Sequence, residues 1–306
     1  MYKIYQMNEN YFSEINSHEK AYILGFIYAD GSVRCNSEHY TLEINQNGER
    51  KDVLEKIIKA LDADIPIKEY SINTFSIQFH SKRIAQDLVK LGAVLNKSLV
   101  LQFPTKEQVP EEFLSSFILG CFDGDGCVWN GKRKKMLVKN EKKPGTMRER
   151  IVHNVKFTYT GNVDFVNALQ DYLVNLGIVN KKTKLNFSKA KNPNNTTCNK
   201  VCTMEYAGRK QMKKLYEYMY SNSPIWCEEK KLKFEKIFCA SEEKSSEDTS
   251  LIAGTPEMVI SSQASDIISV EGSSTIPEMG VESSDSKCEA PNSKEKGEDI
   301  VSSAIK

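Results

Sequence analysis

Two segments of the chain are apolar at nearly every position and end in the same way. Residues 22–29 are apolar apart from one glycine, and Asp30 and Gly31 follow directly. Ninety-five residues later, ILGCFDGDG repeats the ending, with Asp125 and Gly126 at the matching positions. A helix that is apolar on all sides has to be covered nearly all round. We therefore predict two buried helices, each stopped by its final glycine in the left-handed conformation that ends many helices.

Small residues recur one helical turn apart in both segments. Gly25 and Ala29 share one face of the first helix, and Gly120 and Gly124 occupy the matching positions of the second. Small residues at i and i+4 allow two helix backbones to approach closely. The pattern predicts that the two helices pack on each other.

Each segment begins the same order of elements. The segment itself is the first helix, and two strands, a helix, two strands and a last helix follow it. After the first segment the alternating strand patterns are residues 39–45 and 74–80, with amphipathic residues 52–63 between them and 82–94 behind them. After the second segment the order recurs over residues 154–161, 163–178, 182–188, 200–208 and 210–220. The chain is therefore predicted to be an internal duplication, and hairpins with helices on one face are typical of an α+β fold.

Composition divides the chain into parts. We predict a first repeat over residues 1–92, a linker over 93–112 that contains two prolines, and a second repeat over 113–240. Residues 241–306 have no aromatic residue, sixteen serines, and fourteen acidic residues against five lysines, so a disordered tail is expected. The tail's net charge of −9 leaves +10 on residues 1–240, which suggests a polyanionic partner.

The second repeat carries a basic insertion, residues 130–153, that the first repeat lacks. Residues 130–150 hold nine Lys and Arg against Glu141 and Glu149. A charge run is usually a solvated loop, but the place of this one beside the second acidic segment favours contact with phosphate. The residues expected to bind the phosphates of a nucleic acid are Lys132, Arg133, Lys134, Lys135, Lys142, Lys143, Arg148 and Arg150.

Asp30 and Asp125 stand at the negative ends of two helix dipoles, so helix stability does not account for them. If packing brings the carboxylates within about 5 Å, their repulsion is about 3 kcal/mol at an effective dielectric near 20. Divalent cations would offset this, and carboxylates with water and phosphate oxygens are the ligands that Mg²⁺ prefers. Surface carboxylates at ordinary helix ends would explain one such segment but not its repetition. We therefore predict a site for Mg²⁺ or Mn²⁺ at these two residues.

The segments ILGFIYADG and ILGCFDGDG resemble the paired motifs of LAGLIDADG homing endonucleases in their single-chain form, and the resemblance extends from about Tyr11 to Phe238. It implies two αββαββα halves with pseudo-twofold symmetry and the motif helices at their interface. It also implies two curved antiparallel sheets that form a DNA-binding saddle.

The same resemblance implies a site-specific endonuclease that hydrolyses both strands of a long, asymmetric DNA site, leaves 3′ overhangs and acts as a monomer. Asp30 and Asp125 would bind the metal ions. Lys97 and Lys230 are similar to the basic residues that lie near the cleaved phosphates in that family, although Lys231 matches the second position equally well in register. Outward side chains of the strands would read bases in the major groove.

Two other functions on this fold stay open, an intron maturase that binds intron RNA and a protein that binds DNA without cleaving it. The intact Asp-Gly endings favour cleavage, because close carboxylates would only weaken a pure binder's affinity for phosphate. Asp123 and Asp125 also begin like a calcium-binding loop, but no Glu follows at the twelfth position, so we reject that interpretation.

No feature of the sequence indicates secretion or membrane insertion. The eight cysteines form no CxxC pair, and the N-terminal residues lack a basic region followed by an apolar run. No window approaches the roughly eighteen apolar residues that span a bilayer. We expect a soluble protein of a reducing compartment, either the cytoplasm or an organelle matrix.

Overall fold

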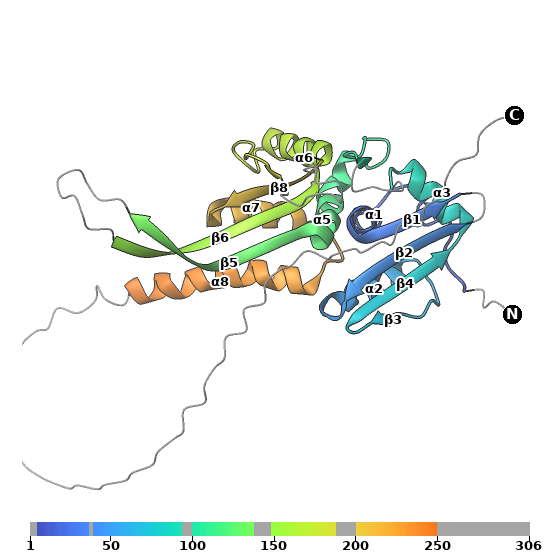
Figure 1. The fold of residues 1–306 in the computed structure, drawn as a ribbon, viewed down its shortest axis with the longest axis horizontal. Helices are drawn as coiled ribbons and strands as arrows, with labels where there is room; N and C mark the ends of the chain where they lie inside the picture. The colour runs from blue at the N-terminus through green and yellow to red at the C-terminus, as the bar shows by residue number, and fades with distance from the viewer. Residues whose placement is uncertain (1–4, 37–38, 94–99, 138–147, 188–199, 250–306) are drawn as a thin grey trace, which may run out of the picture. The chain divides into compact units, whose positions relative to one another are not determined.

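A computed structural model of the chain describes residues 5–36, 39–93, 100–137, 148–187 and 200–249 (Figure 1). Within these ranges, residues 133–137, 148–153 and 240–249 are described by their backbone alone. The predicted acidic tail lies outside the described residues from residue 250 onward. In the part of the chain that is described, no helix is long and apolar enough to cross a lipid bilayer.

The first repeat has the predicted order of elements. Its helices are α1 (His18–Asp30), α2 (Lys51–Ala60) and α3 (Lys82–Lys90), with a 3-10 helix, η1 (Gly48–Arg50), before α2. Its strands are β1 (Gly31–Cys35), β2 (Tyr40–Asn47), β3 (Lys68–Ser71) and β4 (Thr74–His80). The strands pair antiparallel in the order β1-β2-β4-β3.

The second repeat has the same order. Its helices are α5 (Leu114–Asp125), α6 (Val163–Asn175) and α7 (Arg209–Tyr220), with a 3-10 helix, η2 (Glu111–Phe113), before α5. Its strands are β5 (Gly126–Leu137), β6 (Arg148–Asn162), β7 (Asn186–Phe187) and β8 (Val201–Ala207), which pair antiparallel in the order β5-β6-β8-β7. The matching strand orders confirm the duplication and the α+β fold of two αββαββα halves.

A last helix, α8 (Glu228–Thr249), follows the second repeat. It passes residue 240 without interruption, so the boundary predicted at that residue lies inside a helix. Its first turn is held by α2 of the first repeat, because Lys56 Nζ contacts Glu228 Oε1 at 3.1 Å and donates to the carbonyl oxygen of Trp226 at 2.6 Å. The chain therefore returns to the first repeat after completing the second.

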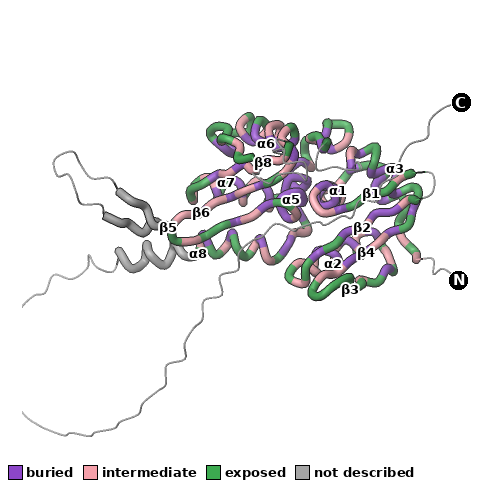
Figure 2. The backbone as a smooth tube through the Cα atoms, viewed as in Figure 1, coloured by how far each residue is buried: buried purple, intermediate pink, exposed green. Residues whose placement is uncertain are grey.

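Alternation along the strands places apolar side chains on one face of each sheet. In the first sheet Val33, Leu42 and Ile77 are buried, and in the second sheet Val128 and Phe157 occupy the corresponding face. The helices α2 and α3 contact the first sheet, and α6 and α7 contact the second. The helices α1 and α5 are buried along most of their length (Figure 2).

The helices α1 and α5 pack on each other through glycine, as predicted. A Cβ added to Gly25 would lie within 3.0 Å of the carbonyl oxygen of Phe117, and a Cβ added to Gly120 would lie within 3.0 Å of that of Tyr22. Tyr22 and Phe117 occupy matching positions of the two repeats. The contact is therefore reciprocal, as a twofold relation between the helices requires.

The prediction that Gly31 and Gly126 end their helices in the left-handed conformation is wrong. Both residues are extended, with φ of −77° and −89°. Their lack of a side chain is required for a steric reason, since a Cβ would lie within 3.0 Å of Ile27 in the first case and of Phe122 in the second. The chain turns directly from helix into strand, and the last helical turn fills the space that a side chain would need.

The basic insertion is not a free loop over its described length. Strands β5 and β6 pair without interruption from Gly126 opposite Tyr159 to Leu137 opposite Arg148. Residues 138–147 lie outside the described part of the chain. The insertion is therefore a two-stranded ribbon continuous with the second sheet (Figure 1).

Replacement of Gly120 by alanine should destabilise the fold by about 3 kcal/mol, because the new methyl group forces the two helix backbones apart. Denaturant unfolding of the full chain measures this loss. Gly161→Ala is a matched control, because its Cβ would approach no atom closer than 3.1 Å. Equal losses in the two variants would contradict a close backbone contact at Gly120.

Candidate metal and nucleic-acid site

Asp30 lies half-buried at the last position of α1, where the neighbouring strand holds its carboxylate. The side-chain amide of Gln46 on β2 donates a hydrogen bond to Asp30 Oδ2 at 2.5 Å. Gln46 is itself buried, with 6% of its surface exposed. A donor at this point offsets part of the unfavourable interaction between the carboxylate and the helix dipole.

Asp125 lies at the matching end of α5 and is exposed. With Tyr159 and Gly161 among its neighbours, it lines a cavity of about 140 Å³. A Cβ added to Gly124 would lie 3.1 Å from Asp30 Oδ2, so the first carboxylate lies against the last turn of the second helix. Burial raises the pKa of Tyr159, and the negative charges of Asp125 and Asp30 raise it further. The two predicted metal ligands therefore lie at the same end of the helix pair.

Lys230, predicted to lie near cleaved phosphates, is buried below the end of α5, with 2% of its surface exposed. Its Nζ donates to the carbonyl oxygens of Phe122, Asp123 and Gly124 at 2.7, 2.6 and 3.1 Å. Three acceptors use all the donors of an ammonium group. Lys230 therefore fixes the backbone directly before Asp125, and its contact with phosphate stays a prediction.

Lys231, which matches the second basic position of the resemblance equally well, makes different contacts. Its Nζ is 3.6 Å from the centroid of the Trp226 ring and 3.9 Å from Glu235 Oε1. Of the two lysines, Lys230 is therefore the one that contacts the last turn of α5.

Asp123, which the sequence pattern suggested only as part of a calcium loop, joins three helices in the interior. It is fully buried, and its Oδ2 accepts hydrogen bonds from the Tyr22 hydroxyl at 2.7 Å and from the Cys227 N–H at 2.8 Å. Burial raises the pKa of Asp123 to about 6, although the charge of Lys230 acts in the opposite direction. These bonds tie α1, α5 and the start of α8 together.

Gln46 and Arg50 are the site residues that the sequence did not reveal. Arg50 Nε donates to Glu229 Oε2 at 2.9 Å, and its positive charge acts on Asp30. Burial lowers the pKa of Arg50, but the hydrogen bond to Glu229 and the nearby negative charges, those of Glu229 and Asp30 among them, together raise it, so the net shift is upward. Neither residue belongs to a recognisable motif. Only the strand register, which pairs the first residue of β1 with Ile44, could have placed them beside the end of α1.

The oxygen donors at the two helix ends fit a hard divalent cation. Mg²⁺ binds proteins through one or two carboxylates and completes its shell with water and substrate phosphate. Asp30 and Asp125 supply that number of carboxylates. Among the described residues no group of three or more His, Cys, Asp or Glu side chains suits a metal ion. Water and phosphate oxygens would therefore have to complete the coordination.

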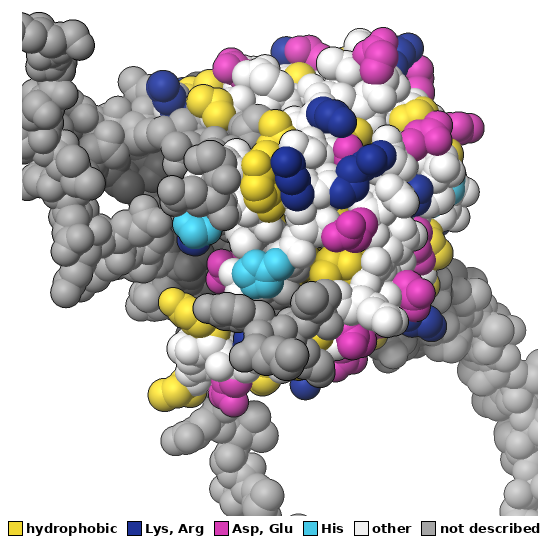
Figure 3. Space-filling model, turned by 90° about the vertical axis from the view of Figure 1, so that its right-hand side faces the viewer, with side chains coloured by type: hydrophobic (Ala, Val, Ile, Leu, Met, Phe, Trp, Pro, Cys, Tyr) yellow, Lys and Arg dark blue, Asp and Glu magenta, His cyan; other side chains and the backbone are white. Residues whose placement is uncertain are grey.

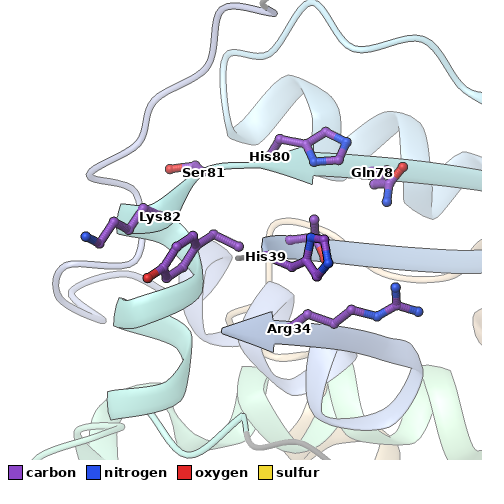
Figure 4. A pocket seen from close by; sticks show the side chains of 8 residues that line it. Arg34, His39, Gln78, His80, Ser81 and Lys82 are labelled. Atoms are coloured by element: carbon purple, nitrogen blue, oxygen red, sulfur yellow. The ribbon is translucent and has the colours of Figure 1, made fainter. Parts of the chain in front are cut away.

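The outer face of the first sheet carries polar side chains in rows across the strands. Arg34 on β1 stands opposite Thr41 on β2, which stands opposite His80 on β4. Arg34, His80 and Gln78 are among the residues that line a hollow of about 450 Å³, and Figure 4 shows these three side chains on strands of the first sheet. Side chains of these types offer the donors and acceptors that read base edges.

The outer face of the second sheet carries different residues, apolar ones among them. The row that corresponds to Arg34, Thr41 and His80 consists of Trp129, Lys156 and Ala207. Lys156 Nζ pairs with Glu205 Oε1 at 2.8 Å, and Trp129 is 40% exposed.

Only one of the residues predicted to bind phosphate has a described side chain, Lys132, which is exposed on β5. The following predicted residues lie in strands described by their backbone alone: Arg133, Lys134, Lys135, Arg148 and Arg150. Lys142, Lys143 and the predicted catalytic residue Lys97 lie outside the described residues. On the face in Figure 3, Lys and Arg side chains are interspersed with Asp and Glu, so the positive charge is not gathered there.

No protein-family model matches the sequence, and no curated protein matches it. Solved structures with a similar fold include LAGLIDADG homing endonucleases. The homing endonuclease I-LtrWI bound to target DNA is 16% identical with a TM-score of 0.46, over 80% of this chain and 96% of that chain. The meganuclease I-AabMI bound to uncleaved DNA is 15% identical with a TM-score of 0.46, over 74% of this chain and 91% of that chain. The meganuclease I-SmaMI bound to uncleaveable DNA is 13% identical with a TM-score of 0.47, over 80% and 99%.

At these identities and TM-scores the likeness carries no argument about what this chain does.

The buried carboxyl of Asp123 should make the fold lose stability as the pH rises from about 4 to about 6. Its pKa in the folded chain, about 6, lies above the ordinary value of 3.8, so the folded state binds the proton more tightly than the unfolded chain. This contribution is complete below the ordinary value and is lost as the pH rises through the folded value. Its full size is about 3 kcal/mol for a difference of about two pKa units.

Denaturant unfolding of wild type and Asp123→Asn between pH 4 and pH 7 measures this effect, because the amide does not titrate. Wild type should gain stability relative to the variant as the pH falls. A stability difference that stays constant across this range would contradict the raised pKa.

Proposed function

We propose that the protein is a site-specific DNA endonuclease of the LAGLIDADG homing type, which hydrolyses both strands with divalent metal ions. The observation that carries this proposal is the reciprocal glycine contact of α1 and α5, which brings Asp30 and Asp125 to the same end of the helix pair. Each carboxylate directly precedes the first strand of a four-stranded antiparallel sheet. Because one chain supplies both halves, a monomer acting on an asymmetric site is the form we expect.

In this proposal Asp30 and Asp125 hold Mg²⁺ or Mn²⁺, which when bound activates a water and stabilises the leaving 3′ oxygen of the DNA. Gln46 orients the Asp30 carboxylate through its amide donor. Arg50 adds positive charge beside it. Lys230 holds the backbone that positions Asp125. No side chain acts as a nucleophile.

DNA would lie along the outer faces of both sheets, which together would form the saddle that the resemblance implies. The major groove admits a two-stranded ribbon and distinguishes all four base pairs. Arg34 can donate two hydrogen bonds to a guanine edge, and Gln78 can pair in the same way with adenine. The β5–β6 ribbon from Lys132 onward adds contacts to phosphate, and Lys97 is the second proposed contact at the cleaved bonds. Cleavage across the minor groove would leave 3′ overhangs.

Asp30→Asn and Asp125→Asn should each abolish double-strand cleavage in Mg²⁺ and leave DNA binding intact or tighter. Each change removes a metal ligand and a negative charge beside phosphate while keeping the side-chain shape. The substrate is a plasmid that carries the uninterrupted insertion sequence. In it, the DNA on the two sides of the insertion that holds the protein's gene is joined directly. Conversion of supercoiled to linear DNA measures cleavage, and gel shift measures binding.

Asp171→Asn is the matched control, because this carboxylate lies exposed on α6 and pairs with Lys182. It should cleave as wild type does. Cleavage that persists in Asp30→Asn or Asp125→Asn, or in excess chelator, would place the chemistry elsewhere. Binding without any cleavage by wild type would favour the maturase or the non-cleaving DNA-binding protein.

The β5–β6 ribbon should add affinity for DNA without a preference for its sequence. Replacing Lys132, Arg133, Lys134 and Lys135 by glutamine should weaken binding to target and random DNA alike. Each lost phosphate contact should reduce the slope of log affinity against log salt by about 0.9. Gel shifts at several salt concentrations measure this slope, and a loss confined to the target would mean that the ribbon reads bases.

A further inference from the structure

The first turn of α8 holds both repeats through consecutive residues. Glu228 Oε1 lies 3.1 Å from Lys56 Nζ. Glu229 Oε2 accepts a hydrogen bond from Arg50 Nε at 2.9 Å, so both acidic side chains contact the first repeat. Lys230, the next residue, donates to the carbonyl oxygens at the end of α5 in the second repeat. The start of the last helix is therefore fixed to both repeats.

The pair of Glu229 and Arg50 lies close to the first proposed metal ligand. Their side chains are 17% and 24% exposed, so water and salt screen the pair less than an exposed one. Asp30 is a second carboxylate whose charge acts on Arg50. The guanidinium therefore has two carboxylates in its surroundings, and the one that it bonds to belongs to α8.

In the part of the chain that is described, the Arg50 side chain donates only through Nε, to Glu229. Arginine also carries N–H donors on its two terminal nitrogens, in a rigid fork that matches a carboxylate or a phosphate. These donors are left for another acceptor. Asp30 Oδ2 accepts from the Gln46 amide, whereas Oδ1 accepts no hydrogen bond from a described residue. A free donor fork and a free carboxylate oxygen thus lie in the same region.

Acidic residues in the first turn of a helix are common, because they interact favourably with the positive end of the helix dipole. That explanation suffices for Glu228, which is 54% exposed. It does not account for a half-buried Glu229 against an arginine of the other repeat. Taking charges out of water costs free energy, so such a pair is weak evidence for a purely stabilising role.

We propose that Glu229 is a positioning residue that keeps Arg50 off the Asp30 carboxylate, so that this carboxylate stays free to bind a divalent cation. While Nε is bonded to Glu229, the terminal nitrogens of Arg50 remain for a phosphate oxygen of DNA. Without Glu229 the fork turns to Asp30, because arginine and a carboxylate form two parallel hydrogen bonds. Asp30 is then shared between an arginine and the metal ion. This inference rests on the metal site of the endonuclease function proposed above.

The first test measures Mn²⁺ binding by the full chain, from the loss of the electron paramagnetic resonance signal of free Mn²⁺. Glu229→Gln should weaken binding about tenfold, as the loss of an outer partner does at known metal sites. The amide keeps the side-chain shape but removes the charge that holds Arg50. Glu228→Gln is the matched control, because it removes the same charge from the adjacent residue while Lys56 keeps its bond to the Trp226 carbonyl oxygen. It should bind Mn²⁺ as wild type does.

A double variant separates an effect through Arg50 from an effect of the Glu229 charge itself. In the Arg50→Gln background no guanidinium can turn to Asp30, so the further change Glu229→Gln should leave Mn²⁺ binding nearly unchanged. Weakening by the same factor in both backgrounds would overturn the inference. Equal weakening by Glu228→Gln and Glu229→Gln would overturn it too, because it would reflect only the loss of negative charge.

Cleavage of the plasmid described above gives an independent readout. Glu229→Gln should need about tenfold more Mg²⁺ for half-maximal cleavage and should reach the wild-type rate in excess Mg²⁺. A lost structural contact would instead lower the rate at every Mg²⁺ concentration, and that result would overturn the inference while leaving the proposed function intact. Mn²⁺ binding that Asp30→Asn does not weaken, or a wild type that does not cleave, would overturn both.

Discussion

The contact of two helix backbones at Gly25 and Gly120 is the constraint on which the rest of the structure depends. Each glycine receives a carbonyl oxygen of the other helix in the space of its missing side chain. The second pair of small residues, Ala29 and Gly124, continues this contact to the ends of α1 and α5, so Asp30 and Asp125 lie at the same end of the helix pair. The same contact places two carboxylates at the negative ends of two helix dipoles. The amide of Gln46 offsets part of that unfavourable charge, and the remainder makes the site suited to a cation.

The helix pair also needs polar contacts to fix its alignment. Apolar packing around α1 and α5 resists separation more than rotation or sliding, because apolar contacts have no direction. The hydrogen bond from the Tyr22 hydroxyl to Asp123 crosses the interface and has a direction. Lys230 then holds the last turn of α5 through three carbonyl oxygens. Burial of these groups costs stability, as the raised pKa of Asp123 indicates, and in return the backbone before Asp125 has one position.

The sequence predicts the fold well because its strongest signals are periodic and repeated. Apolar helices with small residues one turn apart, followed twice by the same order of strands and helices, leave little choice of architecture. Gly31 and Gly126 were misinterpreted, because an Asp-Gly ending does not reveal whether the chain turns back or continues as a strand. Gln46 was missed since only the register between β1 and β2 brings it to Asp30, and register depends on pairing across the sheet. The sequence does not reveal which of Lys230 and Lys231 contacts α5, because that depends on the helical phase of α8.

Duplication constrains the residues of the two halves less as their distance from the helix pair increases. A contact that both halves build together, such as a glycine against a carbonyl oxygen, must keep the same chemistry on each side. One strand away, each half surrounds its own carboxylate, so Gln46 donates to Asp30 whereas Gly161 lines the cavity beside Asp125. At the outer faces nothing ties the halves together, and Arg34, Thr41 and His80 have Trp129, Lys156 and Ala207 as counterparts. Asymmetry thus grows from the shared helices outward, as the proposed recognition of an asymmetric DNA site by a single chain would require.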